Sequence, residues 1–555
     1  MGHKFEDIQG AALVLAISAF VSQLLALTRD RIFAHQFGTG EVLDIYFAAF
    51  RVPDFIFTTI ASLVSMTILI PFFTRYLANG EEVKAKQLLN SALNLFLYVI
   101  VIVCGLAFIF MDRLVGIVVP GFIDEVMVAN FVLLSRIILL QPILLGISNL
   151  LATVVHSLRR FFIYALTPLL YNLGIIIGAT LLYPRMGISG LAWGVVLGAL
   201  LHLLVQLPTV IRSGYAPRPS LRVNSTILKE VLLTTVPRTF TLGVHQLVLL
   251  VLMSMASILT TGSISVFSFS FALQSVPLAI IGMSFSVAAF PTLSALYAKG
   301  DKIKFLQSVT TATRHIIFWS LPIMSLFIVL RAQIVRTILG TGEFDWTSTR
   351  LVAASLALFS ISVVAQSLVL LFVRAYYAIG NTRKPLVINS SSSAVIIALS
   401  FVLVPLFAKS DMFRYFFEHL FRVNDLVGTS VLMLPLAYTI GMIVNLGLYW
   451  VVFNRDFYGF HKTLRHTIRH SFYAAVIMGF VSYLALGLFD NLFDLETLMG
   501  VFLQGFLAGL LGIVACVVIL KLIGNKEIND IGRSLRSRFW KSRPIGPALE
   551  NQSEL

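Results

Sequence analysis

Seven charged residues stand inside apolar stretches of this 555-residue chain or at the end of one, where each needs a partner, water or a function. At bilayer depth a single charge costs about 2.5–3.5 kcal/mol even on insertion scales. Five of the seven are arginines, whose planar guanidinium can hold two phosphate oxygens at once. This excess of positive charge predicts a cavity for an anionic substrate. The candidate cavity residues are Arg29, Asp44, Arg51, Asp54, Arg136, Arg238 and Arg374.

The apolar stretch around Arg51 holds more of these charged residues than any other. Asp44 and Arg51 are seven residues apart, which places them on one face of a helix, and Asp54 is close enough in sequence to pair with Arg51. Pro53 removes a backbone hydrogen bond and predicts a bend. Two interpretations remain open: a structural ion pair that steadies the bend, or a polar face on a water-filled cavity.

The three later arginines also admit a structural role when taken singly. Arg238 follows Pro237, and its guanidinium can satisfy the carbonyl groups that the proline leaves free. Arg374 lies nine residues before Arg383, too far for its side chain to reach the membrane surface fully. Several such arginines on different helices, with few acids to neutralise them, favour a cationic cavity.

The elements that must position these residues are membrane-spanning helices. Mean hydropathy is +0.91, 58% of residues are hydrophobic and 12% are charged, which a soluble domain could not bury. Fourteen stretches reach the length of about 20 residues that crosses a bilayer. We predict spans at 8–28, 43–73, 89–111, 127–156, 161–183, 188–212, 229–260, 264–297, 313–341, 348–379, 385–408, 428–454, 467–489 and 496–522.

The basic residues predict the orientation of these spans. Most of the 41 Lys and Arg fall on one side, which the positive-inside rule assigns to the cytoplasm together with both termini. This asymmetry and anionic headgroups account for the net charge of +15, so we expect membrane lipids as partners and no nucleic acid. The first apolar run ends in Arg29-Asp30-Arg31 and not in a cleavage site, so it is not a signal peptide.

Chemical groups for catalysis or metal binding are sparse. Cys104 and Cys516 both lie in apolar spans, and their spacing suits neither a metal site nor a disulfide framework. No loop assembles an acid, base or metal cluster at the membrane edge. We therefore predict no enzyme activity, no cofactor and no metal.

An internal repeat predicts two lobes. The segment from Pro71 to Lys84 recurs from Pro291 to Lys304 at an offset of 220 residues, after the second long span of each half. Six spans separate the copies, so the halves share one orientation, related by an axis along the membrane normal. We predict an all-α protein with an N-terminal lobe (1–223), a C-terminal lobe (224–460), two extra helices (461–523) and a basic cytoplasmic tail (524–555). The aromatic-rich segment 409–427 predicts a short helix at the outer interface.

An ordered set of motifs then resembles the MurJ (MviN-type) lipid II flippases. It includes Phe37-Gly-Thr-Gly40, Ala49-Phe-Arg-Val-Pro-Asp54, Val119-Pro-Gly-Phe122 and Arg159-Arg-Phe161. It continues through Pro237-Arg238, Ser263-Ile-Ser265 with Pro277, and Arg374 to Pro385, so it covers at least residues 1–455.

The resemblance implies a member of the multidrug/oligosaccharidyl-lipid/polysaccharide exporter superfamily in the bacterial inner membrane. Its two six-helix lobes would surround a cationic cavity, and spans 13 and 14 would hold a polyprenyl tail in a groove. The expected cargo is lipid II, an undecaprenyl-pyrophosphate-linked disaccharide-pentapeptide, moved outward by alternating access for peptidoglycan synthesis. We expect a monomer that works beside the cell-wall synthesis machinery.

The chain departs from the family at several cavity positions. Gln23, Phe57 and Ala272 stand where relatives often carry a basic residue, while Arg29 is retained. Pyrophosphate contacts could therefore be redistributed to the other arginines. The alternatives are a flippase for another polyprenyl-linked oligosaccharide of O-antigen type, or a small-molecule exporter of the same superfamily.

Overall fold

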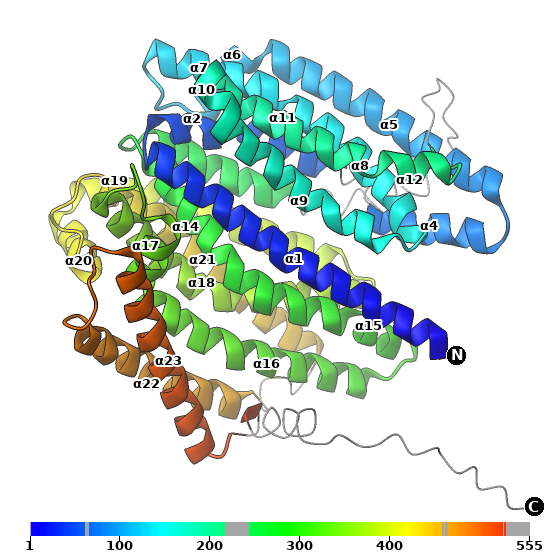
Figure 1. Cartoon of the computed structure of the whole chain (residues 1–555). Helices are drawn as coiled ribbons and strands as arrows, with labels where there is room; N and C mark the ends of the chain where they lie inside the picture. Colours follow the sequence, from blue (N-terminus) through cyan, green and yellow to red (C-terminus); the bar gives the residue numbers. More distant parts are fainter. Residues whose placement is uncertain are drawn as a thin grey trace, which may run out of the picture.

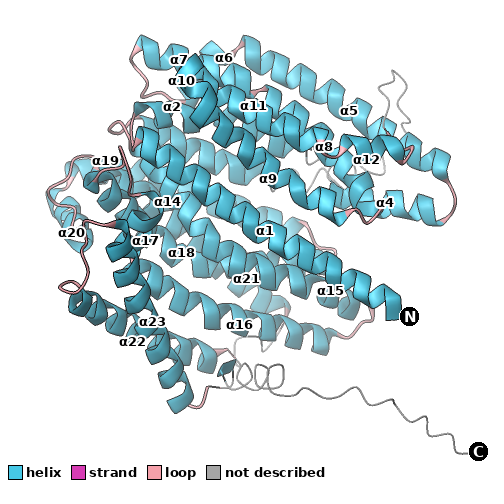
Figure 2. Cartoon of the chain, viewed as in Figure 1, coloured by secondary structure: helices cyan, strands magenta, loops and turns pink. Residues whose placement is uncertain are grey.

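The computed structural model describes residues 2–61, 66–216, 243–457, 460, 464–525 and 527–528. These residues form helices and connecting loops (Figure 2). Eleven of the described helices are long and apolar enough to cross a membrane, and they correspond to predicted spans 3–6 and 8–14. The helical architecture is thus confirmed. The described parts of spans 1, 2 and 7 hold other helices, so the count of fourteen and the lobe symmetry remain predictions.

In the N-terminal half, α1 occupies the position of span 1, and the described residues of span 2 begin as two helices, α2 and α3, separated at Phe50. The bounds are α1 (Gly2–Phe37), α2 (Glu41–Ala49), α3 (Arg51–Ile56), η1 (Phe57–Ala61), α4 (Met66–Ala78), α5 (Glu82–Ile109), α6 (Met111–Val118), α7 (Glu125–Ile138), α8 (Leu140–Ser157), α9 (Phe161–Ile177), η3 (Gly178–Leu182), α10 (Tyr183–Met186), α11 (Ser189–Leu204) and α12 (Leu207–Arg212).

In the C-terminal half, the helix Gly243–Ser257 occupies part of predicted span 7. The others are α14 (Ser263–Pro277), η4 (Leu278–Met283), α15 (Ser284–Ala298), α16 (Lys302–Val329), α17 (Arg331–Leu339), α18 (Trp346–Ala378), α19 (Arg383–Lys409), α20 (Asp411–Phe421), η5 (Thr429–Leu432), α21 (Met433–Asp456), α22 (Arg465–Phe489) and α23 (Leu498–Leu522).

Figure 1 shows the helices of the N-terminal half as one bundle lying over those of the C-terminal half, with α1 along the junction. We call the end that carries α20 and the α1–α2 turn the α20 end. The other end, which carries the N-terminus and the α4–α5 and α15–α16 turns, is the opposite end (Figure 1). Helices α22 and α23 pack on each other and on α16, outside the two bundles.

Predicted span 9 needs correction. It was expected over residues 313–341, whereas α16 begins eleven residues earlier at Lys302 and ends at Val329, and α17 follows as a separate helix. The Asp301 side chain accepts from the Lys304 N–H and so starts α16 in a charged stretch. Hydropathy alone misses this polar first turn.

The sequence repeat is a structural repeat at the opposite end. Gly80 and Gly300 adopt the left-handed region with φ of 74° and 75°, each two residues after a helix that ends at Ala78 or Ala298. An acid then pairs with the lysine three residues on: Glu81 with Lys84 at 2.7 Å, and Asp301 with Lys304 at 2.9 Å. The two turns are thus built in the same way.

The π-helical segments η1 and η4 follow the same repeat. Adding the offset of 220 to Phe57–Ala61 gives residues that overlap Leu278–Met283. Such segments widen a helix locally and are frequent at functional sites. The helix at predicted span 2 and the one at predicted span 8 are therefore irregular at equivalent depths.

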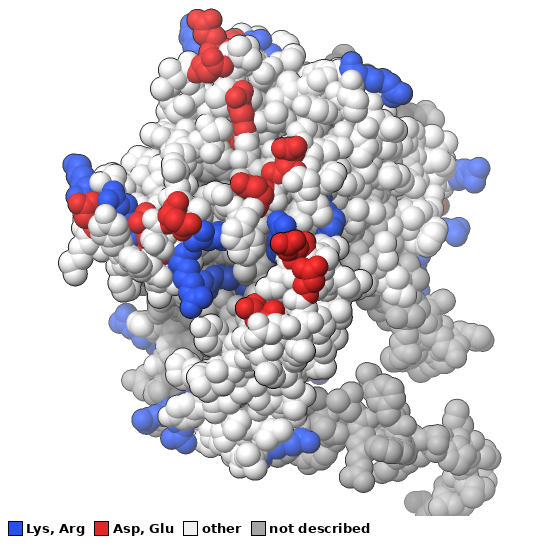
Figure 3. Space-filling model, turned by 60° about the vertical axis from the view of Figure 1, so that its left-hand side comes forward, with Lys and Arg blue, Asp and Glu red and all other residues white. Residues whose placement is uncertain are grey.

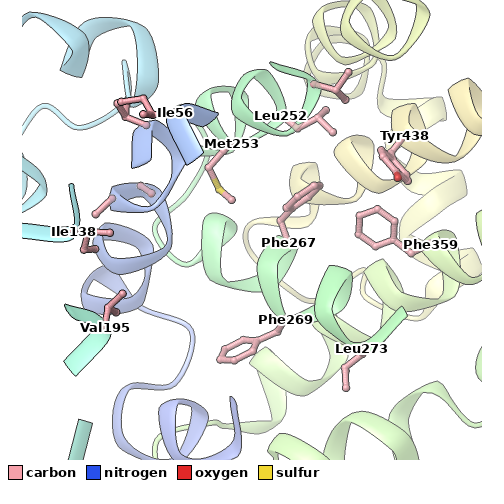
Figure 4. Close-up of a cluster of buried hydrophobic side chains, with 14 of the residues drawn as sticks. Ile56, Ile138, Val195, Leu252, Met253, Phe267, Phe269, Leu273, Phe359 and Tyr438 are labelled. Atoms are coloured by element: carbon pink, nitrogen blue, oxygen red, sulfur yellow. The ribbon is translucent and has the colours of Figure 1, made fainter. Parts of the chain in front are cut away.

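One apolar core joins both halves. Figure 4 shows Ile56, Ile138 and Val195 of the N-terminal half in the same view as Phe267, Phe359 and other residues of the C-terminal half. The Phe267 and Phe359 rings meet edge to face at 5.4 Å. Apolar packing therefore runs across the junction between the two halves.

Candidate substrate cavity and the contacts that close it

Arg29 belongs to a polar cluster between α1 and α9. Its guanidinium pairs with Asp30 at 2.7 Å and donates to Asn172 Oδ1 at 3.1 Å. The Asn172 amide in turn donates to the Pro168 carbonyl. The Arg29 side chain keeps 24% of its surface exposed, so this cation is held firmly but remains accessible.

Arg51 opens α3 just beyond a break in the helix. Pro53 has no N–H for the Ala49 carbonyl, and α2 indeed ends at Ala49 before α3 begins at Arg51. The bend predicted from Pro53 is therefore present. Within the described residues, Arg51 Nε is buried without an acceptor, and no ion pair joins Arg51 to Asp54. A structural ion pair between the two is not what the structure shows.

Asp54 and its surroundings extend this polar region. Asp54 is partly exposed on α3, and Gln141 of α8 donates to the Tyr171 hydroxyl of α9 at 3.1 Å. Gln141 Oε1 is buried without a donor among the described residues. Polar groups on α1, α3, α8 and α9 thus combine cations with unsatisfied acceptors, which suits a hydrated or ligand-binding surface.

Asp44 lies elsewhere, at the junction of the two halves. Its carboxylate accepts from the Gly262 N–H at 2.6 Å, the Ser265 N–H at 2.8 Å and the Ser265 hydroxyl at 2.5 Å. These donors belong to the first turn of α14 and the residue before it, so Asp44 caps a helix of the C-terminal half. Asp44 is only 3% exposed, and these contacts join the two halves, while its place in a cavity stays a prediction.

Arg136 and Arg374 also have protein partners. Arg136 pairs with Asp112 at 2.7 Å and donates to the Phe108 carbonyl, which ties α7 to α5 and α6. Arg374 donates to the carbonyl and sulfur of Met283, the last residue of η4. Its position beside this π-helix links it to the irregular part of predicted span 8. Arg238 lies outside the described residues.

Further hydrogen bonds cross between the halves at the α20 end. Arg31 of α1 donates to the Thr337 carbonyl at 2.6 Å and more weakly to that of Ile338, the last turn of α17. A cation at a helix C-terminus complements the helix dipole, as an anion does at the N-terminus of α14. Thr39 and Ser348 share a hydrogen bond of 2.6 Å, and the Glu343 N–H donates to the His35 carbonyl.

Close backbone approach accompanies these bonds. A Cβ on Gly38 would lie 2.5 Å from the Glu343 carbonyl oxygen, and one on Gly262 would lie 2.6 Å from that of Thr39. Both glycines also have positive φ, of 59° and 93°. The motif Phe37-Gly-Thr-Gly40 therefore serves contact between the halves.

Nearly all hydrogen bonds between the halves, counted over the described residues, lie at the α20 end. The exception is deeper, where Gln246 donates to Thr58 at 3.2 Å. The α20 end is therefore closed by polar contacts, and the polar cluster around Arg29 and Arg51 lies on its inner side along α1 and α3.

The sequence patterns did not single out Arg31, Asn172 or Ser348 as residues that form the polar cluster or the contacts between the halves. Arg31 lies two residues after Arg29 and could have been considered with it, but its acceptor at Thr337 lies 306 residues away in sequence. No group of three metal-ligating side chains occurs within the residues that the structure describes.

Comparisons with known proteins agree with this architecture. The family model "Lipid II flippase MurJ" matches residues 33–504. The curated "Probable lipid II flippase MurJ" of Vibrio cholerae serotype O1 is 26% identical over 385 residues, covering 68% of this chain and 73% of that protein. The "Lipid II flippase MurJ" of Burkholderia cenocepacia is 23% identical over 408 residues, covering 72% of this chain and 79% of that protein.

Solved structures share the fold. "Lipid II flippase MurJ, inward closed conformation" superposes with a TM-score of 0.73 at 21% identity, covering 93% of this chain and all of that one. An inward-facing multidrug resistance MATE family transporter of the MOP superfamily gives 0.64 at 14% identity, covering 82% of this chain and 99% of that one. Because the family model spans most of its length, the chain belongs to the MurJ family of lipid II flippases, multi-pass proteins of the bacterial inner membrane.

Proposed function

We propose that this lipid II flippase works by alternating access, with Arg29 and Arg51 as the principal contacts for the pyrophosphate. The observation that carries the proposal is the contrast between the two ends of the bundle. The α20 end is bridged between the halves by Asp44, Arg31 and Thr39. The cationic residues lie behind this closure.

The proposal places the α20 end outside the cell and both termini in the cytoplasm. The cavity then opens toward the inner leaflet, where lipid II is made available. Arg29, which is 24% exposed, would offer guanidinium donors to phosphate oxygens. Arg51, whose Nε has no acceptor among the described residues, would offer others. Arg374 is a further candidate because its η4 partner is an irregular element. The Asp54 carboxylate would orient these arginines or balance part of their charge.

The other predicted cavity residues take different roles in this proposal. Asp44 closes the outer end, and Arg136 with Asp112 braces the N-terminal lobe. The lobes are residues 1–223 and 224–460, and α22 with α23 (461–523) forms a separate unit for the lipid tail. The basic tail of residues 524–555 faces anionic headgroups, and the chain acts as a monomer beside the cell-wall synthesis machinery.

Transport follows from breaking the closing contacts. In the inward-facing state the Asp44 and Arg31 caps satisfy the ends of α14 and α17. By binding the cationic residues, a substrate would draw the two lobes together at the opposite end and so favour their separation at the α20 end. The irregular segments η1 and η4 are placed to absorb the bending that this requires.

Rescue of a cell depleted of its own lipid II flippase tests the function. Expression of this chain should restore growth and outward labelling of lipid II. A protein that inserts normally but restores no labelling, in a host that a close relative does rescue, would contradict the proposal.

A further inference from the structure

Two arginines of different elements lie next to each other at the α20 end. Arg331 begins α17, and Arg422 follows the end of α20 in the left-handed region, with φ of 58°. Burial and then the like charge of Arg422 lower the pKa of Arg331, as expected for neighbouring guanidinium groups.

The bonds that these arginines make leave most of their donors free for a ligand. Arg331 donates to the Ile328 carbonyl at 3.2 Å and to the Phe421 carbonyl at a long 3.5 Å. Arg422 donates to the Tyr483 hydroxyl at 3.4 Å. A guanidinium has five N–H donors, so these three contacts use a minority of the ten available.

Carboxylates do not neutralise this pair in the described part of the chain. The nearby Asp425 is taken by Arg350, through contacts of 2.6 and 2.7 Å, and neither Arg331 nor Arg422 has an ion-pair partner among the described residues. Figure 3 shows basic side chains on this face of the molecule, with acidic side chains beside them. Two adjacent cations without a counter-ion attract an anion.

The surroundings indicate that the anion belongs to a lipid. Tyr483, which meets Arg422, lies in an exposed apolar stripe of α22 with Phe480, Leu484 and Leu488, the last of them 65% exposed. Tyr483 is six residues, about 9 Å, from the end of α22, a depth typical of interfacial tyrosines. On α20 the side chains of Tyr415, Phe416 and Leu420 are exposed as well. Acyl chains can lie on the stripe while a headgroup reaches the arginines.

We propose that Arg331 and Arg422 bind the phosphate of a lipid headgroup at the α20 end, between α17, α20 and α22. The placement of this site in the outer leaflet rests on the orientation in the proposed function. The headgroup is either that of an anionic phospholipid or the pyrophosphate of a polyprenyl lipid that has reached the outer side. Helix α17 connects this site to the contacts between the two halves, because Arg31 of α1 caps the C-terminal end of α17.

Lipid binding to the purified full chain tests the site. Wild type and Arg331→Gln/Arg422→Gln are mixed in one detergent solution and titrated, with native mass spectrometry as the readout. The probes are phosphatidylglycerol, phosphatidylcholine with the same acyl chains, and undecaprenyl pyrophosphate. We expect the double variant to bind phosphatidylglycerol or the pyrophosphate about tenfold more weakly, and phosphatidylcholine almost as wild type does.

Control variants separate binding from folding. Arg185→Gln removes an exposed arginine at the same end and should leave binding unchanged. Arg422→Gln alone removes only one long hydrogen bond, so its melting temperature should stay at the wild-type value while binding falls. A preference for phosphatidylglycerol identifies the ligand as bulk phospholipid, and a preference for the pyrophosphate identifies it as cargo.

Equal binding of both anionic lipids by wild type and double variant would overturn the inference. So would displacement of phosphatidylglycerol by an equal concentration of inorganic phosphate, because the acyl chains would then contribute nothing. A chain that binds lipid through these arginines but moves no lipid II keeps this inference and loses the proposed function. If the chain moves lipid II but the double variant binds the anionic lipids as wild type does, the proposed function stands and this inference fails.

Discussion

Asp44 and Ser265 are 221 residues apart in sequence and share two hydrogen bonds, one from the Ser265 amide and one from its hydroxyl. With the Gly262 amide, these bonds make the Asp44 carboxylate a cap for the N-terminus of a helix in the other half of the molecule. A capping carboxylate normally belongs to the helix that it caps. Here the cap exists only while the two halves are closed at this end, so it stabilises one conformation.

Asp44→Asn should therefore shift the chain toward the state open at the α20 end. Hydrogen bonds to a charged acceptor contribute about 1.5–3 kcal/mol each, so losing the charge should change the ratio of the two states about tenfold. Spin labels at Ile123 and Val427, exposed by 89% and 81% in the two halves, would report a longer distance.

A matched control for this experiment is Asp124→Asn. Asp124 caps α7 at the same end, but its donors Val126 and Met127 belong to its own half. An equal lengthening in both variants would refute a specific role for Asp44 in closure.

Arg51→Ala should abolish lipid II transport while the amount of protein in the membrane stays close to wild type. Arg51 is in no ion pair of the described chain, so its removal breaks no direct contact with a carboxylate. Arg51→Lys should restore transport only in part, because an ammonium cannot grip phosphate at two points. The two readouts are lipid II transport in reconstituted vesicles and the protein level in the membrane, measured by immunoblotting.

Arg29→Ala provides the contrast. It removes the ion-pair partner of Asp30, which is 6% exposed, so both transport and thermal stability should fall. If Arg51→Ala lost protein as Arg29→Ala does, Arg51 would be structural and the cavity assignment would fail.

Cysteine labelling in intact cells tests the orientation. Single cysteines near Gly80, Arg160 and Lys302 should be protected from impermeant reagents added outside, and those near Thr261 and Asp411 should react. The exposed turns at Gly80 and Gly300 make protection there informative, because burial cannot explain it. Outside reaction of Lys302→Cys would reverse the topology.

The segment after α23 should give stability a defined pH dependence. Burial raises the pKa of Glu527, but hydrogen bonds from its own backbone, Arg314 and Thr467 outweigh it, so the pKa lies below its ordinary value. A carboxyl whose pKa is lowered on folding stabilises the protein fully above its unfolded pKa and loses that effect as the pH falls through its folded pKa. Melting temperature should therefore drop through the acid range below pH 4.5.

Glu527→Gln should lower the melting temperature at neutral pH and flatten this acid dependence. Breaking a buried pair costs about 3–5 kcal/mol, and less here because Arg314 is 30% exposed. The exposed Glu496→Gln serves as the control. Identical pH profiles for Glu527→Gln and wild type would show that this contact does not hold the segment in place.

Local patterns in the sequence predicted local structure well. The hydropathy pattern located the eleven long helices, the repeat located the turns at Gly80 and Gly300, and the aromatic spacing located α20. Pro53 predicted the break before Arg51. Each of these features depends on residues within a few positions of one another, so a linear pattern carries the information.

The partners of buried charges could not be predicted in the same way. Spacing placed Asp44 and Arg51 on one face, but the donors to Asp44 come from α14. Exchanging the two charges, Asp44→Arg with Arg51→Asp, would not test a simple pair. In the structure it would put a guanidinium at the N-terminus of α14, where the helix dipole repels it, so loss of function would be expected for either role of Arg51.

Vesicle transport is the most direct measurement of the central claim. Purified chain is reconstituted with fluorescent lipid II, and a membrane-impermeant quencher reports the fraction that changes leaflet. Wild type and Arg185→Gln should move lipid II well above protein-free vesicles, and Arg51→Ala should fall to the protein-free rate. Equal movement by wild type and Arg51→Ala, or none by a wild type shown to be folded and inserted, would contradict the account.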